Sequence, residues 1–200
     1  MKQHYFLLFI LLSFASYSQQ KLVHIEYSGV TTFDDEKYPG ATILTKDASR
    51  LVEIHHDGAI LTCKRAIVFK KKNFFKAFGN VLINQGDTIT QKSDYVDYNG
   101  NTKMVVSKGN VILRDPKMTL TTDTLNFDRQ KQQLFYKHNA IIKDATNTLK
   151  SKVGTYLLAH KKFTATTKVL VTNPDHQLES NYLDYYTDSA YAYLYGPSTI

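Results

Sequence analysis

The sequence predicts an all-β fold built from a short repeat, and three observations support this prediction. Apolar and polar residues alternate over runs of strand length, as in S-D-Y-V-D-Y and M-V-V-S-K-G-N-V-I-L, which flank the turn N-G-N-T-K between Ser93 and Leu113. The same unit returns at a nearly constant interval along the chain. Turn-forming residues separate the runs, and self-similarity of this kind is typical of repeat architectures.

Two markers recur in each unit and measure the interval. The second residue of the Ser-Asp pair falls at Asp94, Asp123, Lys152 and Asn181, in steps of 29 residues, and Lys64 lies 30 residues before Asp94. The Gly of Gly-Asn-Val follows each marker after 15 residues, at Gly79, Gly109, His138, Thr167 and Gly196. An apolar pair comes next, at Val81/Ile83, Val111/Leu113, Ala140/Ile142 and Val169/Val171.

The predicted elements follow in order from this frame. Residues 21–29 alternate and predict a first strand. Residues 31–48, with the acidic run Asp34-Asp35-Glu36 and a Pro39-Gly40 turn, predict a divergent opening repeat with a longer loop. Regular strands are then expected at 51–56, 59–69, 74–84, 88–98, 103–114, 118–128, 132–143, 148–158, 163–172, 177–186 and 190–200, and no helix is predicted.

Turn residues separate these strands at both ends of each repeat. One set is Asn99-Gly100-Asn101, Asp128-Arg129-Gln130 and Thr187-Asp188, and the opposite set is Gln85-Gly86-Asp87, Asp115-Pro116 and Asn173-Pro174-Asp175. Asn-Gly between two alternating runs is a strong hairpin signal, and proline interrupts a continuous strand. Consecutive strands are therefore expected to be neighbours.

Side chains point alternately to the two faces of a strand, so each repeat is predicted to present one apolar face. Stacked repeats would join these faces into a wall with an aromatic ladder at Tyr98, Phe127, Tyr156 and Tyr185. Several positions of the opposite face are apolar too, namely Leu82, Ile112, Ile141 and Leu170. This pattern favours a folded-over sheet that packs in part and leaves an apolar trough.

The N-terminus predicts export. Lys2 precedes an apolar run from Tyr5 to Phe14, and the small residues of Ala15–Ser18 follow it. This order is typical of a cleavable secretory signal over residues 1–18. The run is too short to span a bilayer well, since a spanning helix needs about 20 residues. An uncleaved membrane anchor is the alternative.

The remaining polar residues predict neither a catalytic centre nor a metal or cofactor site. The single cysteine, Cys63, excludes an intramolecular disulfide framework and is interpreted as a wall residue. Asp94 and Asp123 share one repeat slot, which favours a turn or edge role over a pair of catalytic carboxylates. His55 and His56 point apart on a strand and are interpreted as exposed polar residues. The net charge of +7 suits an anionic partner, although nucleic-acid-binding motifs are absent.

Two sequence motifs recur, L-x-[ST]-D-x-L-x-[YF]-D and A-x-G-N-V-x-[IL]-x-D. They match best at Leu120–Asp128, Ala77–Ile83 and Gly109–Asp115, and more loosely at Leu61–Ala66 and Gly196–Ile200. From about residue 21 to the end, these repeats resemble the OstA/LptA family of lipopolysaccharide-transport proteins. The chain departs from the motifs where Lys64, Lys152 and Asn181 replace the Asp and where His138 and Thr167 replace the Gly.

The resemblance implies a half-open β-jellyroll, or β-taco, of consecutive antiparallel strands over residues 19–200. It implies a non-enzymatic periplasmic protein, with association at the outer membrane as a further expectation. Its groove would shield the acyl chains of lipopolysaccharide or lipid A and bridge them toward the outer membrane. The expected protein partners are LptC- or LptD-like jellyroll modules, joined edge to edge, and further copies of the chain, joined head to tail.

The wall positions are the expected lipid contacts: Val81, Ile83, Tyr98, Val111, Leu113, Phe127, Tyr136, Ile142, Tyr156, Val169, Val171 and Tyr185. Basic residues recur at corresponding turns and are expected to meet lipid phosphates along one rim: Lys70, Lys71, Lys72, Arg129 and Lys131, with Lys161-Lys162 at a similar turn.

Two other interpretations remain open. The chain could be a structural or adhesive β-solenoid surface protein, with a closed core and no ligand. A carbohydrate-active β-helix would need a cluster of exposed acids that the sequence does not supply. Because Ile200 ends an apolar strand without a cap, that edge is expected either to dock a partner or to continue in a longer protein.

Overall fold

The computed structural model describes residues 22–86, 89–189 and 191–199. The predicted signal over residues 1–18, the turn residue Asp87 and the predicted strand ends at 88, 190 and 200 lie outside the described residues. Within them the all-β prediction is confirmed, since the only helical segments are the 3-10 turns η1 (Lys70–Lys72) and η2 (Leu158–His160). None of the described helices has the length and hydropathy needed to cross a membrane.

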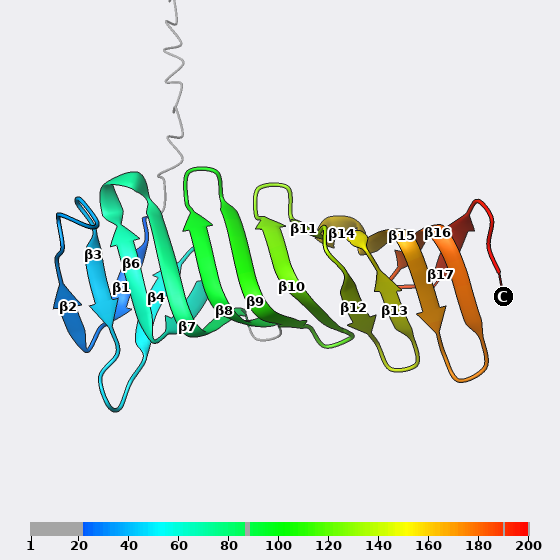
Figure 1. Ribbon diagram of the computed structural model, residues 1–200, viewed down its shortest axis with the longest axis horizontal. Helices are drawn as coiled ribbons and strands as arrows, with labels where there is room; N and C mark the ends of the chain where they lie inside the picture. The colour runs from blue at the N-terminus through cyan, green and yellow to red at the C-terminus, as the bar shows by residue number, and fades with distance from the viewer. Residues whose placement is uncertain (1–21, 87–88, 190, 200) are drawn as a thin grey trace, which may run out of the picture.

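The strands follow the predicted order and are separated by short turns (Figure 1). They are β1 (His24–Tyr27), β2 (Val30–Thr32), β3 (Thr42–Thr45), β4 (Val52–His56), β5 (Ala59–Cys63), β6 (Arg65–Phe69), β7 (Phe74–Gln85), β8 (Ile89–Asn99), β9 (Met104–Arg114), β10 (Thr119–Asp128), β11 (Gln133–Tyr136), β12 (Ala140–Lys143), β13 (Thr148–Ser151), β14 (Val153–Leu157), β15 (Lys162–Thr172), β16 (Gln177–Tyr186) and β17 (Tyr191–Tyr195).

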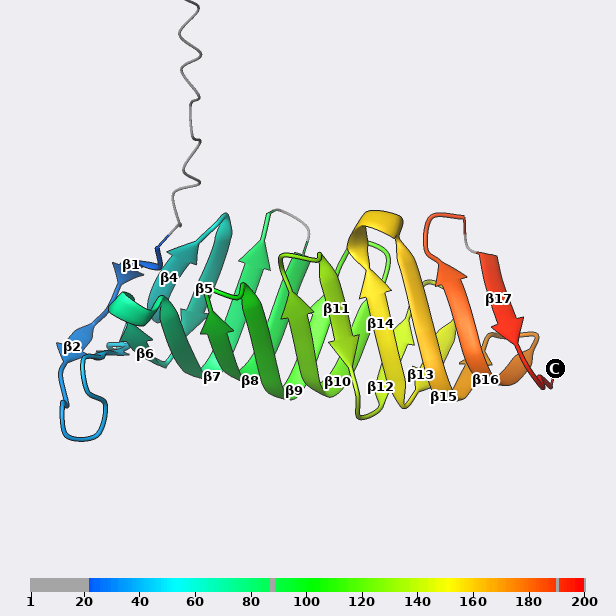
Figure 2. The same cartoon turned by 90° about the horizontal axis from the view of Figure 1, so that it is seen from above.

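The strands form one antiparallel sheet that is folded lengthwise along a crease into two leaves. Leaf A holds β2, β3, β6, β11, β14 and β17, and leaf B holds β1, β4, β5, β12 and β13. The longer strands β7, β8, β9, β10, β15 and β16 run through both leaves. The strands succeed one another along the long axis, with β2 and β17 at opposite ends, and the two leaves overlap when seen from above (Figures 1 and 2).

The crease lies where the Gly-Asn marker recurs. The register between β7 and β8 shifts from Phe78 to Val81, and the residues between them, Gly79 and Asn80, have φ values of 73° and 49°. Two successive left-handed residues form a bulge that turns the strand from one leaf into the other. Glycine adopts the first of these conformations without a steric penalty. The repeated motif is therefore a corner inside the long strands β7, β9 and β15.

This geometry corrects the predicted place of the Asp marker. Asp94 and Asp123 lie in the register shifts of β8 and β10 at the crease, rather than at a turn or a sheet edge. Asn110 Nδ2 donates a hydrogen bond to Asp94 Oδ2 at 2.7 Å. The Gly-Asn motif of β9 is thus hydrogen-bonded to the Asp marker of β8 at the crease.

Replacing Thr167 by glycine is expected to stabilise the protein by about 1 kcal/mol. Thr167 occupies the glycine slot with φ 66°, and a left-handed conformation costs an L-residue roughly 1–2 kcal/mol. The measurement is the urea midpoint at constant m-value. As a control, Thr166→Gly removes a side chain from extended backbone in β15 and should destabilise by about 0.5–1 kcal/mol. Equal losses for both variants would contradict the corner geometry.

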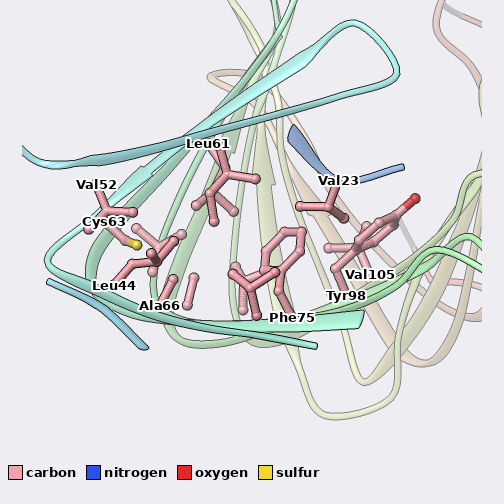
Figure 3. Packing of buried hydrophobic residues seen from close by; sticks show 14 residues of the cluster. Val23, Leu44, Val52, Leu61, Cys63, Ala66, Phe75, Tyr98 and Val105 are labelled. Atoms are coloured by element: carbon pink, nitrogen blue, oxygen red, sulfur yellow. The ribbon is translucent and has the colours of Figure 1, made fainter. Parts of the chain in front are cut away.

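Side-chain size along the inner face affects how closely the leaves can approach at the crease. Many inward positions there are small, namely Ala66, Ala77, Ser107, Gly154 and Ala165 in leaf A and Cys63, Ser93, Ala140, Ser151 and Ser180 in leaf B, whereas Leu125, Tyr136 and Leu183 in the same rows are large. Larger side chains follow farther from it, including Leu61, Phe75 and Tyr98 (Figure 3). The leaves can approach each other at the crease and are held apart beyond it.

Candidate functional site: a trough between the two leaves

Each leaf presents a cross-strand row to the space between the leaves, and both rows are apolar except for Gln91 in leaf B. In leaf A the cross-strand row is Phe75, Tyr98, Val105, Phe127, Leu134, Tyr156, Phe163 and Tyr185. In leaf B it is Ile54, Leu61, Ile83, Gln91, Leu113, Leu120, Ile142, Leu149, Val171 and Leu178. The predicted ladder residues share the first row, with Val105, Leu134 and Phe163 between them.

Two cavities lie in the trough between these rows. The N-terminal chamber, of about 210 Å³, is lined by residues that include Ile54, Ile83, Tyr98, Leu113, Phe127, Arg129 and Leu158. The C-terminal chamber, of about 610 Å³, is lined by residues that include Ile142, Leu149, Phe163, Val171, Leu178 and Tyr185. Ile89, Asp115, Met118 and Tyr156 line both chambers and lie between them. The C-terminal chamber is within the usual range of ligand pockets, about 300–1,000 Å³.

The twelve predicted lipid contacts divide into two groups. Eight of them line a chamber: Ile83, Tyr98, Leu113, Phe127, Tyr156, Ile142, Val171 and Tyr185. The other four, Val81, Val111, Tyr136 and Val169, are at most 2% exposed and pack near the crease. The alternation of apolar residues gives the face of the sheet, but it does not give the distance of a residue from the crease.

The predicted basic residues lie at the turns of leaf A, which stack on one another as rim A. Backbone hydrogen bonds link these turns, from Gly100 N to Asn73 O (2.7 Å), Arg129 N to Lys103 O (3.1 Å), Leu158 N to Gln132 O (3.0 Å) and Thr187 N to Lys161 O (2.9 Å). Lys70, Lys71, Lys72 and Lys131 are exposed there. Lys162 instead lies on the outer face of leaf A, with Nζ 2.8 Å from Asp184 Oδ2.

The turns of leaf B form the opposite rim B, at residues 57–58, 115–118, 144–147 and 173–176. Asp115 Oδ1 accepts hydrogen bonds from the amides of Lys117 and Met118, and Asp144 and Asn173 accept the equivalent bonds in the next two turns. These side chains replace backbone partners within the turn, which explains the Asp or Asn at the start of each.

Polar contacts join the two rims across the mouth of the trough. Arg129 Nη2 lies 2.9 Å from the backbone oxygen of Asp57 and 3.3 Å from its Oδ2. Lys117 Nζ lies 3.5 Å from Asp188 Oδ1, and Tyr185 Oη donates to Asp144 Oδ2 at 3.2 Å. Arg129 therefore points into the mouth, where its side chain is only 12% exposed.

Residues 20–181 match a family described as OstA-like protein. The chain belongs to this OstA-like family. The resemblance that the repeats suggested is confirmed over most of the described residues. No curated protein matches the chain.

Among solved structures, the OstA-like chain is similar to LptH from Pseudomonas aeruginosa, described as the LptA-homologous periplasmic component of the lipopolysaccharide transport device. The two chains are 13% identical, with a TM-score of 0.50 over 53% of this chain and 80% of the other. At 13% identity, this similarity shows the fold and nothing more. It confirms the predicted half-open β-jellyroll.

The charged groups at the mouth of the OstA-like trough have shifted pKa values with clear causes. A hydrogen bond from Lys161 lowers the pKa of Asp188, and Lys117 adds to this effect. Burial opposes ionisation of Asp144, yet hydrogen bonds from the Asn147 and Thr146 amides hold its pKa below the ordinary value. Both carboxylates are therefore charged at neutral pH.

Two other predicted residues have defined places in the OstA-like chain. Cys63 is fully buried in the N-terminal core, as predicted, and burial raises the pKa of its thiol to about 11. The histidines are half-buried rather than exposed. His56 lines the N-terminal chamber with its ring centroid 5.0 Å from that of Tyr98, whereas His55 Nε2 lies 2.7 Å from Glu53 Oε1. Among the described residues no His, Cys, Asp and Glu side chains gather to hold a metal ion.

Several residues of the site were not predicted from the sequence. Met118 and Leu158 stand at the ends of the predicted strands 118–128 and 148–158, but in the structure they line the chambers from the adjacent turns. Leu178 and Ile89 line chambers from their strands, but a register shift in each strand reverses the parity set by the inward residues near the marker. Extending the two-residue parity to the strand ends would therefore have identified Leu158, which follows Tyr156 by two residues, but not Leu178 or Ile89.

Proposed function

We propose that this OstA-like chain is a periplasmic lipopolysaccharide-transport protein that holds acyl chains in the trough and bridges them toward the outer membrane. The observation that carries the proposal is the largely apolar lining of two cavities between polar rims. Each buried methylene contributes about 0.8 kcal/mol, so a multi-chain lipid needs such a lining to cross water. The family and the described role of LptH support the same conclusion.

The terminal strands support the bridging part of the proposal. Within the described residues β2 pairs only with β3, and β17 pairs only with β16. An unpaired strand edge recruits another strand. We propose that these edges join further jellyroll modules, either LptC- or LptD-like proteins or a second copy of this chain.

A structural role with a closed core is the competing function. It requires the wall residues to fill the space between the leaves. The volume of about 610 Å³ in the C-terminal chamber favours a ligand-binding role instead. The exposed side chains on its mouth, Lys117 and Asp188, indicate that this chamber reaches solvent.

Val171→Asp is expected to weaken lipopolysaccharide binding by at least about tenfold, or 1.4 kcal/mol. Val171 is half-buried and lines the C-terminal chamber, so the new carboxylate would meet the acyl chains directly. Binding is measured with fluorescently labelled lipopolysaccharide on the purified chain. Val111 and Ile142 are less suitable positions because both are buried and a charge there also affects folding.

The matched control is Leu170→Asp, on the neighbouring residue of β15 that points to the outer face. Far-UV circular dichroism checks that both variants are folded. Leu170→Asp should bind as the unmodified chain does. Equal binding by the unmodified chain and by folded Val171→Asp would refute acyl-chain binding in this chamber.

A further inference from the structure

Two ion pairs bridge the mouth of the trough at corresponding turns, with opposite polarity. The first rim pair joins Asp57 on rim B to Arg129 on rim A. Two turns farther along each rim, the second rim pair joins Lys117 on rim B to Asp188 on rim A. The basic residue therefore lies on rim A in the first pair and on rim B in the second.

The two pairs differ in how easily they can open. The Arg129 side chain is 12% exposed and bonds to both a carboxylate and a backbone oxygen of Asp57. Shielding from water strengthens this pair, since a charged side chain out of solvent is costly to leave without its partner. Lys117 and Asp188 are 66% and 52% exposed, and exposed ion pairs contribute little because water and salt screen them. We therefore call the first rim pair, Asp57 and Arg129, the strut, because it is expected to stay closed. The second rim pair can open, so that its residues bind another charged group.

A third charged group converges on the second rim pair. Lys161, from rim A, places Nζ 2.9 Å from Asp188 Oδ2, while Lys117 reaches Oδ1 of the same carboxylate from rim B. All three residues line the mouth of the C-terminal chamber. The Asp188 carboxylate thus occupies a position on this mouth that two lysines from opposite rims share.

We propose that Lys117 and Lys161 form a phosphate-binding pair for an acyl lipid whose chain enters the C-terminal chamber, and that Asp188 occupies this position until the lipid arrives. A phosphate monoester carries about −1.5 to −2 charges at pH 7 and three acceptor oxygens, so it competes well with one carboxylate. The proposal rests on acyl-chain binding in the trough and adds the group that orients the lipid.

The chemistry of the neighbouring groups agrees with this role. Asp115 and Asp144, the other two acids in the lining of this chamber, already accept hydrogen bonds from the amides of their own turns, and Asp144 accepts a further one from Tyr185. The N-terminal chamber is smaller, about 210 Å³ against about 610 Å³, and the strut crosses its mouth. The phosphate-bearing end of the lipid is therefore assigned to the C-terminal chamber.

The test compares three probes on the whole chain: lysophosphatidic acid, monoacylglycerol with the same acyl chain, and inorganic phosphate. The unmodified chain should bind lysophosphatidic acid about tenfold tighter than monoacylglycerol, as charge-assisted bonds to one phosphate allow. The double variant Lys117→Gln, Lys161→Gln should lose this difference and bind monoacylglycerol unchanged. Asp188→Asn should raise the affinity for lysophosphatidic acid, because the competing carboxylate is removed.

The control double variant is Lys92→Gln, Lys150→Gln, which removes two exposed charges from the outer face of leaf B, outside the chamber linings. It should bind both lipids as the unmodified chain does. Equal losses in the two double variants, or none in the first, would overturn the phosphate pair while leaving the trough in place. Binding of neither lipid would overturn both proposals. Displacement of lysophosphatidic acid by millimolar inorganic phosphate would assign the pair to free anions instead.

Discussion

Val111→Asp is expected to lower the free energy of unfolding by about 3–5 kcal/mol, the cost of an unpaired buried charge. Val111 is 1% exposed and packs beside the crease in the C-terminal core, where neither water nor a cation can solvate a carboxylate. Domains of this kind are stable by only about 5–15 kcal/mol, so the variant should be largely unfolded in mild urea. Urea unfolding followed by far-UV circular dichroism measures the loss.

The neighbouring substitution Ile112→Asp is the control. Ile112 points to the outer face of leaf B, where its cross-strand partner is Lys92. A carboxylate there remains hydrated and faces a lysine, so the free energy of unfolding should change by no more than about 0.5 kcal/mol. If the two substitutions had equal effects, the assignment of inner and outer faces would be wrong.

Gly154→Val is expected to destabilise the protein by about 1–3 kcal/mol through overpacking. Gly154 lies opposite Tyr136 across the β11–β14 pair, and a Cβ atom at this position would stand 2.4 Å from Tyr136 Oη and 2.5 Å from its Cζ. The ring cannot move aside easily, since it is 1% exposed and its hydroxyl is hydrogen-bonded to Ser151. The shift of the urea midpoint gives the size of the effect.

A double-mutant cycle separates this clash from a general cost of changing the strand. Tyr136→Leu makes room above residue 154, so combining it with Gly154→Val should recover part of the loss. The expected coupling is about 0.5–3 kcal/mol, as for residues in contact. Thr155→Val, one residue farther along β14, should be nearly neutral because it faces outward. Strict additivity of the Tyr136 and Gly154 changes would argue against the close approach.

The regular strands were predictable because their signals are local. Alternation, Asn-Gly turns and the repeat interval placed β7, β8, β9 and β10 to within a residue or two. The predicted strands 59–69, 132–143 and 148–158 are each divided at the crease, at Lys64, at residues 137–139 and at Lys152. Alternation continues on both sides of each division, with its phase unchanged across 137–139 and shifted by one residue at Lys64 and Lys152, so each run was predicted as one strand.

The candidate site was predictable in part. Leu113 and Val111 share a face and were assigned the same role, yet Leu113 lines the N-terminal chamber and Val111 is packed at the crease. Arg129 fitted the pattern of basic turns, but its guanidinium crosses the mouth to Asp57. Which turn residue reaches the opposite rim depends on the twist of the leaves, and no repeat position encodes it.

The sequence by itself determined the β class, the order of the strands and the inner face of the side chains that flank each marker. Those features depend on backbone geometry and on neighbours two to about thirty residues away. The tertiary structure alone decided the two chambers, the strut between Asp57 and Arg129, and the meeting of Lys117 with Asp188, residues separated by 72 and 71 positions. The opening of the leaves is set by side-chain volumes summed over both inner faces and by the accumulated twist, which are properties of the folded sheet as a whole.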